Sequence, residues 1–109
     1  MNISIGNDHA GTDYKFRIIE FLNSKHIEVT NYGTDSDSSV DYPDFAHKLT
    51  REILKNEGSF GILICGTGVG VSIAANKISG ARAALLDKIE TTAIARAHNH
   101  INILALSSA

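Results

Sequence analysis

The chain has 109 residues, of which 43% are hydrophobic and 20% charged, and its formal net charge at pH 7 is −2. This length and composition fit one globular domain. The slightly acidic balance excludes the electrostatic pattern of a nucleic-acid-binding protein, and no apolar window approaches the roughly 18 residues of a membrane span. No secretory signal is visible at the N-terminus, and a single cysteine excludes an internal disulfide, so a cytoplasmic location is the expected one.

Strands and helices are predicted to alternate along the chain. In chain order they are a strand at 2–6, a helix at 12–25, a strand at 27–32, a helix at 43–56, a strand at 60–64, a helix at 69–77, a strand at 81–86, a helix at 89–97 and a strand at 101–106. The polar segment 33–41 has no periodicity and is predicted to be the most mobile loop. The alternation predicts an α/β fold, a Rossmann-like three-layer α/β/α sandwich with a five-stranded parallel sheet, whose ligand binds beyond the carboxyl ends of the strands.

The stretch Phe60 to Gly70, FGILICGTGVG, joins a buried strand to a helix and holds the only cysteine, Cys65. Gly66, Gly68 and Gly70 let the backbone turn tightly and approach a ligand closely. The helix that follows directs unpaired N–H groups and the positive end of its dipole at the same place. An anionic ligand and a readily ionised thiol are therefore expected here.

Further polar residues are expected at the same edge of the sheet. They follow the first three strands or precede the fifth: Asn7, Asp8, His9, Gly11, Gly33, Thr34, Cys65 to Ser72, His98, Asn99 and His100. A thiol, acid–base side chains and a glycine loop on one rim favour an active site. Simpler interpretations remain open, because a lone cysteine at a strand end is usually a small buried hydrophobe and Asp8 could cap a helix.

The spacing of the residues argues against a metal site and against a dinucleotide-binding site. The pair His98 and His100 has no cluster of Cys or carboxylate residues to complete a metal site, so no metal is expected. The order strand, GTGVG loop, helix, strand and Asp87 resembles a dinucleotide-binding unit, which requires G-x-G-x-x-G. Here the glycines follow G-x-G-x-G and Val71 occupies the third glycine's place, so no nicotinamide cofactor is expected.

The segments GNDHAG, YGTDS, DYPDFA, ILICGTGVGVSIAANK and HNHINILAL, in this order, resemble the ribose-5-phosphate isomerase B family, which includes allose- and galactose-6-phosphate isomerases. The resemblance covers essentially the whole chain. It implies a three-layer sandwich with a five-stranded parallel sheet, in homodimers or homotetramers with active sites between subunits. It also implies aldose–ketose interconversion of a sugar phosphate in the pentose phosphate pathway, through an enediolate, without metal or organic cofactor.

The resemblance also implies residue roles. Cys65 would be the base that takes a proton from C2 of the open-chain aldose and returns one at C1. The Thr67 hydroxyl and the backbone N–H groups of the glycine loop would stabilise the enediolate oxygen. His98 would help to open the furanose ring, with Asp8 nearby, and a neighbouring subunit would supply His98 and Asn99. The implied substrate-binding residues are His9, Tyr42, Gly66, Gly68, Val69, Gly70, Ser72 and Asn99.

The end of the chain departs from the family. Family members continue after the fifth strand with a helix that covers the sheet and with arginines for the phosphate, whereas this chain has Ser107, Ser108 and Ala109 there. The expectation is one isomerase domain, 1–109, without that helix, and weak phosphate affinity unless Arg82, Arg96 or a partner subunit supplies an arginine.

Two functional alternatives remain. Cys65 and His98 favour ribose 5-phosphate, but allose 6-phosphate or galactose 6-phosphate would suit the same chemistry. A protein of another class, a non-catalytic module that binds a sugar phosphate or nucleotide, would use the same glycine loop.

Overall fold

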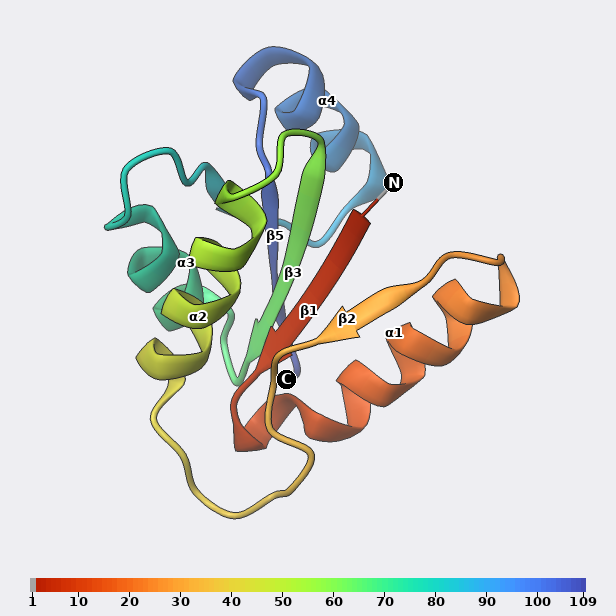
Figure 1. Ribbon diagram of the computed structural model, residues 1–109, viewed down its shortest axis with the longest axis vertical. Coiled ribbons are helices and arrows are strands. Elements are labelled where there is room, and N and C mark those ends of the chain that lie inside the picture. The colour runs from red at the N-terminus through yellow and green to blue at the C-terminus, as the bar shows by residue number, and fades with distance from the viewer. Residues whose placement is uncertain (1) are drawn as a thin grey trace.

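A computed structural model describes residues 2–109 and has a five-stranded parallel sheet with helices on both faces (Figure 1). The elements are β1 (Asn2–Asn7), a 3-10 helix η1 (His9–Gly11), α1 (Thr12–Ser24), β2 (Val29–Asn31), α2 (Tyr42–Leu54), β3 (Ser59–Cys65), α3 (Val69–Asn76), β4 (Ala83–Leu85), α4 (Ile89–Asn99) and β5 (Ile103–Ser107). All nine predicted strands and helices are present with boundaries shifted by a few residues. The predicted fold class is confirmed.

The sheet has the strand order β2-β1-β3-β5-β4, and every neighbouring pair is parallel. From β1 the chain passes through α1 to β2 on one side, then returns through α2 to β3 on the other side of β1. This reversal between β1 and β3 is the switch point at which open α/β sheets bind ligands. The residues that follow these strands meet there, since the Asp8 N–H donates to Ile64 O at 3.2 Å.

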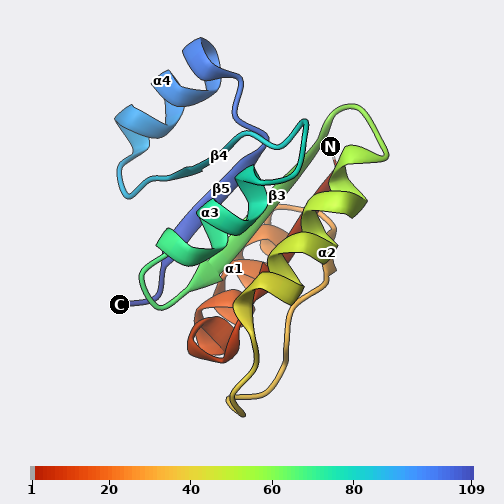
Figure 2. The same cartoon turned by 90° about the vertical axis from the view of Figure 1, so that its left-hand side faces the viewer.

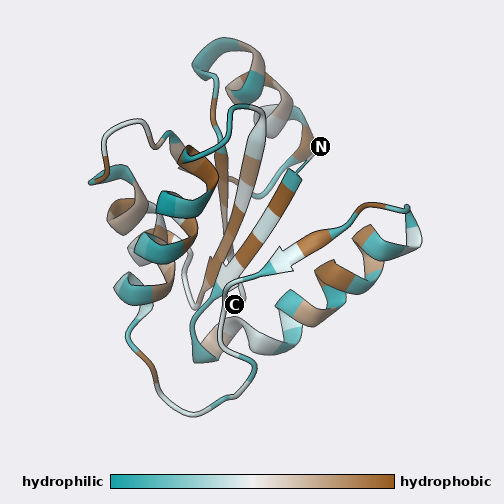
Figure 3. Cartoon of the chain, viewed as in Figure 1, coloured by the Kyte–Doolittle hydropathy of each residue, from teal (hydrophilic) through white to brown (hydrophobic). Residues whose placement is uncertain are grey.

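The hydrophobic core lies between the sheet and the helices α2 and α3. Leu49 and Ile53 of α2 are buried as their spacing predicts, and they pack in one cluster with Leu63 of β3, Val71 of α3 and Ile103 of β5. Each such side chain contributes about 1.5–3 kcal/mol when fully buried. Figure 3 shows hydrophobic residues along the central strands and hydrophilic ones on the outer turns of α2. This packing holds the start of α3 firmly beside β3.

The opposite face of the sheet, with α1 and α4, is covered less completely. Phe21 of α1 is 60% exposed, and Ile89 of α4 is 86% exposed, although both lie on helix faces that the sequence marks as apolar. Figure 2 shows α4 standing away from the other helices, beyond β4 and β5. Leu85, Leu104 and Leu106 line a cavity of about 790 Å³ between α4 and α1.

Among residues 2–109, no helix combines the length and the apolar character needed to cross a bilayer.

Candidate active site

Cys65 ends β3 at the switch point of the sheet. Its side chain is only 5% exposed, and its Sγ accepts a hydrogen bond from the Gly68 N–H at 3.2 Å. The backbone at Gly68 has φ +77, the left-handed region that side chains disfavour. A Cβ there would also lie 2.5 Å from Leu85 Cδ1 and 2.9 Å from the Leu106 carbonyl carbon. Glycine is therefore required at 68 for the turn that directs an N–H group at the sulfur.

The loop after Cys65 carries unpaired hydrogen-bond donors. The Val69 N–H donates to Thr67 Oγ1 at 3.2 Å, but those of Gly66, Thr67 and Gly70 have no acceptor within the described residues. Helix α3 begins at Val69 without a side-chain cap, so its N-terminal dipole faces the same place. These donors favour negative charge on a ligand beside the sulfur.

Tyr42 and His9 lie on the rim around this loop. The Tyr42 ring packs against Gly70 so closely that a Cβ on Gly70 would lie 2.8 Å from Tyr42 Cε1. His9 follows β1, is half-buried, and accepts the Val40 N–H at its Nδ1 at 3.1 Å. Both residues are thus held at the carboxyl edge of the sheet, as the sequence predicts.

Asp8 and Ser72 already use part of their hydrogen-bonding capacity. Asp8 is 7% exposed, and its Oδ1 accepts from the Ala10 N–H at 3.0 Å, so it caps η1. This is the simpler of its two sequence interpretations. Ser72 Oγ donates to Val69 O at 2.7 Å, while the Val69 side chain is 46% exposed at the first turn of α3.

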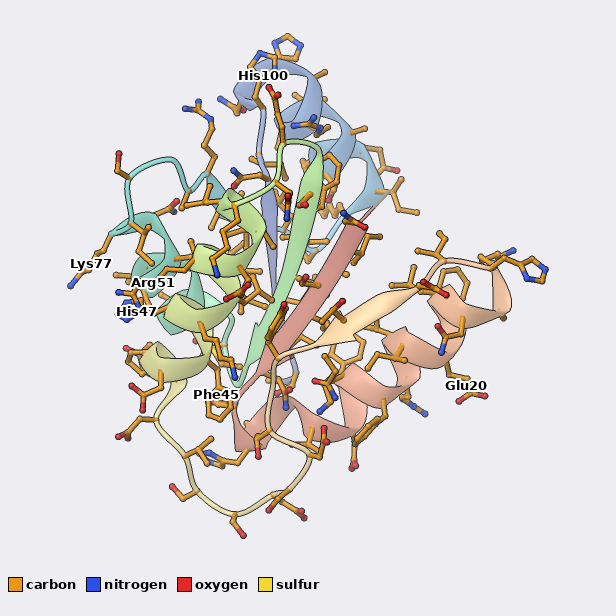
Figure 4. All side chains as sticks on the ribbon, in the orientation of Figure 1. Glu20, Phe45, His47, Arg51, Lys77 and His100 are labelled. Atoms are coloured by element: carbon orange, nitrogen blue, oxygen red, sulfur yellow. The ribbon has the colours of Figure 1, made fainter. Side chains whose placement is uncertain are left out.

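His98, Asn99 and His100 do not lie on the rim of Cys65. They end α4, and Asn99 O accepts from Arg82 Nε at 2.7 Å, just before β4. Figure 4 shows His100 at one end of the molecule and Phe45, in the first turn of α2, toward the other. The expectation that these residues gather with Cys65 in one chain is wrong, because residues that precede a parallel strand lie at the amino edge of the sheet.

The two arginines considered for phosphate lie at that distant edge as well. Arg82 is occupied by Asn99 O, and Arg96 donates to Ile101 O at 2.9 Å with its guanidinium 4.8 Å from the Phe60 ring centroid. Neither reaches the Cys65 rim of its own chain. Arg17, which no sequence motif marks, lines a depression on the rim with Ala10, Ser107 and Ser108 among others. Ser107 Oγ donates to Gly66 O at 2.8 Å, which ties this depression to the glycine loop.

Lys15 is a further residue of this region that the sequence does not mark. Its side chain is completely buried and pairs with the Asp35 carboxylate. Asp35 accepts hydrogen bonds from Lys15 and from Asn31. Both lower the pKa of the Asp35 carboxyl below its ordinary value, and the bond from Lys15 has the larger effect. No sequence signal marks this lysine, because helical lysines are almost always solvated.

A search of residues 2–109 for three or more His, Cys, Asp or Glu side chains that could share a metal ion finds no such group.

The fold and the site together define an α/β protein with a thiol beside unpaired backbone N–H donors at the switch point of its sheet, an arrangement that suits an anionic ligand. A family model described as Ribose/Galactose Isomerase matches residues 3–109, and the chain belongs to that family.

Individual relatives agree with this assignment. Ribose-5-phosphate isomerase B of Escherichia coli (strain K12) is 42% identical over 106 residues, which are 97% of this chain and 71% of that protein. The crystal structure of a ribose 5-phosphate isomerase from Thermotoga maritima is 50% identical with a TM-score of 0.94, covering 98% of this chain and 74% of that one. A structure of ribose-5-phosphate isomerase B from Mycoplasma genitalium with bound ribulose-5-phosphate is 47% identical with a TM-score of 0.92. The match covers 98% of this chain and 72% of that one.

Proposed function

We propose that this isomerase interconverts ribose 5-phosphate and ribulose 5-phosphate. The relatives named for that activity, one of them with ribulose-5-phosphate bound, support the choice of substrate. The observation that carries the proposal is the position of Cys65, whose sulfur accepts the Gly68 N–H beside unpaired N–H donors at the switch point. The proposed active domain is 1–109.

The proposed base is the Cys65 thiolate. It removes the C2 proton of the open-chain aldose, and the electron pair forms the C1–C2 double bond of an enediolate with negative charge on O1. The same thiol then donates its proton to C1 while the O2 proton moves to O1, so atoms and charge balance. The N–H groups of Gly66, Thr67 and Gly70 and the Thr67 hydroxyl would stabilise the charge on O1, where one donor is typically worth on the order of a hundredfold in rate.

The proposed substrate contacts surround this centre. His9 and Tyr42 would contact the sugar phosphate from the β1 and α2 sides, and Gly66, Gly68, Val69 and Gly70 would contact it through the backbone. Ser72 Oγ already donates to Val69 O, so it would act as a hydrogen-bond acceptor toward a substrate hydroxyl. Asp8 would lie beside the ring-opening site.

We propose that a second copy of the chain supplies His98 and Asn99, in a homodimer or a homotetramer. Cys65 would otherwise lack the histidine that opens the furanose ring. The exposed apolar side chains of α4, with Ile89 at 86% and Ile94 at 56%, support burial of this helix against another copy. We also propose a role in the pentose phosphate pathway and a cytoplasmic location, as the resemblance to the family implies.

The test is turnover of ribose 5-phosphate by the wild type and by Cys65→Ala, with binding of ribulose 5-phosphate to both measured by calorimetry. Loss of the base should lower kcat by about 10²–10⁴-fold, whereas binding should change little. Turnover within a few-fold of the wild type in Cys65→Ala would reject Cys65 as the base. A wild type that binds the ligand and does not turn it over would identify a binding module instead.

A further inference from the structure

Lys15 of α1 is a cation buried against a loop backbone. Its side chain is completely buried, and its Nζ donates to Thr34 O at 2.6 Å and to the Asp35 carboxylate, which is 65% exposed. Burial of an ammonium costs several kcal/mol, and the exposed carboxylate and the Phe16 ring, whose centroid is 4.3 Å from Nζ, return only part of that. Stability alone therefore does not account for a lysine here. Lysine provides a hydrogen bond to Thr34 O, which an apolar side chain at this position could not make.

Two buried neutral side chains hold the same loop, residues 33–41, which links β2 to α2. Asn7 Nδ2 donates to Thr34 O at 3.1 Å, and Thr12 Oγ1 donates to Ser36 O at 2.8 Å. Asn7 is fully buried and Thr12 is 7% exposed. With Lys15, three donors from β1 and α1 thus fix the first half of a loop that its composition predicts to be mobile.

The second half of the loop reaches His9. The Ser38 N–H donates to Ser36 Oγ at 2.9 Å, a turn that carries the chain from the anchored half toward Val40. The Val40 N–H then donates to His9 Nδ1 at 3.1 Å. A nitrogen that accepts a hydrogen bond carries no proton, so the proton of the neutral His9 ring lies on Nε2.

We propose that Lys15 is a positioning residue: it holds loop 33–41 so that the Val40 N–H keeps His9 in its Nε2–H form, a hydrogen-bond donor to the phosphorylated substrate. Phosphate and sugar oxygens accept hydrogen bonds, so the opposite tautomer, with Nε2 as an acceptor, would present the wrong group to a phosphate. The identity of the substrate rests on the proposed function, whereas the tautomer of His9 does not.

The experiment compares the wild type, Lys15→Met and Lys25→Met by two readouts. Methionine retains most of the lysine stem without the ammonium, and Lys25 is an exposed lysine that caps the C-terminus of the same helix. Nitrogen-15 NMR should report protonated Nε2 and bare Nδ1 for His9 in the wild type and in Lys25→Met, and mixed tautomers in Lys15→Met. The KM for ribose 5-phosphate should rise about tenfold in Lys15→Met with a much smaller change in kcat, the effect of one weakened substrate hydrogen bond.

A folded Lys15→Met protein that keeps the Nε2–H form and the wild-type KM would overturn the proposal. If that variant does not fold, the wild-type spectrum still tests the proposal, because a neutral His9 ring with its proton on Nδ1 would overturn it. The experiment distinguishes failure of the proposed function from failure of the role of Lys15. A tautomer change without any wild-type turnover of ribose 5-phosphate would reject the proposed function and support the role of Lys15.

Discussion

Cys65 and His98 lie at opposite ends of the sheet within one chain. Cys65 pairs with Ser107 at the carboxyl end of β5, whereas His98 is in the last turn of α4, just before the amino end of β5. The length of β5 at about 3.3 Å per residue separates these edges by about 15 Å, beyond the reach of any hydrogen bond. A site that uses both side chains must therefore combine two copies of the chain.

This separation predicts complementation between two inactive variants. Cys65→Ala and His98→Ala should each lose most turnover of ribose 5-phosphate, but mixed dimers would contain one site with both wild-type residues. After exchange of subunits, activity should return to about a quarter of the wild-type value, since half of the dimers are mixed and each has one intact site. The measurement is the rate of ribulose 5-phosphate formation in the mixture.

The matched control is Cys65→Ala mixed with a Cys65→Ala, His98→Ala double variant, in which no site is intact and no activity should return. Native mass spectrometry shows whether subunits have exchanged. Exchange without recovery of turnover would contradict a shared site.

Much of the fold could be predicted from the sequence, because strand and helix periods are local properties of the chain. The alternation of elements predicts a parallel sheet, and the stripe containing Leu49 and Ile53 marks the buried face of α2. Strand order could not be predicted in this way, since the connections are long enough for several orders. It depends on packing between segments far apart in the chain.

The candidate site was predictable only where residue type and backbone geometry are tightly linked. Gly68 is such a case, because few other residues tolerate its φ of +77. The burial of Lys15 was not predictable, since it follows from contacts with a loop about twenty residues away in sequence. The position of His98 could be predicted, because a residue before a parallel strand lies at the amino edge of the sheet, whatever its chemistry.

Substitution of Gly68 by alanine should destabilise the protein more than the same change at Gly58. Both glycines have positive φ, +77 and +82, so each variant has the left-handed backbone cost of about 1–2 kcal/mol. A Cβ at Gly58 would meet nothing within 4 Å, whereas at Gly68 it would clash with Leu85 and with the Leu106 backbone. Overpacking should cost Gly68→Ala about 1–3 kcal/mol more, measured as the free energy of unfolding in urea.

The Gly68→Ala variant should also lose turnover, because a shifted turn no longer directs its N–H at Cys65 Sγ. Equal losses of stability at positions 58 and 68 would mean that the loop relaxes freely and does not depend on glycine packing.

The Lys15–Asp35 pair should make stability depend on pH in the acid range. The pKa of Asp35 is lowered from 3.8 in the folded protein, first by the hydrogen bond from Lys15 and then by that from Asn31. A lowered folded-state pKa means that the ionised carboxylate contributes stability above about pH 4, and that this contribution is lost as the pH falls through the folded value. Because Asp35 is 65% exposed, the contribution should not exceed about 1 kcal/mol.

The measurement is the urea midpoint of the wild type and of Asp35→Asn between pH 7 and pH 2. The wild type should be more stable at neutral pH, and the difference should shrink steadily below about pH 4. Asp37→Asn, on the same loop, is the control, since the Asp37 carboxylate has no hydrogen-bond partner among residues 2–109 and its replacement should have little effect at any pH. A wild-type advantage over Asp35→Asn that stays constant down to pH 2 would show that the charge of Asp35 does not stabilise the fold, and that Lys15 is held by the loop carbonyl alone.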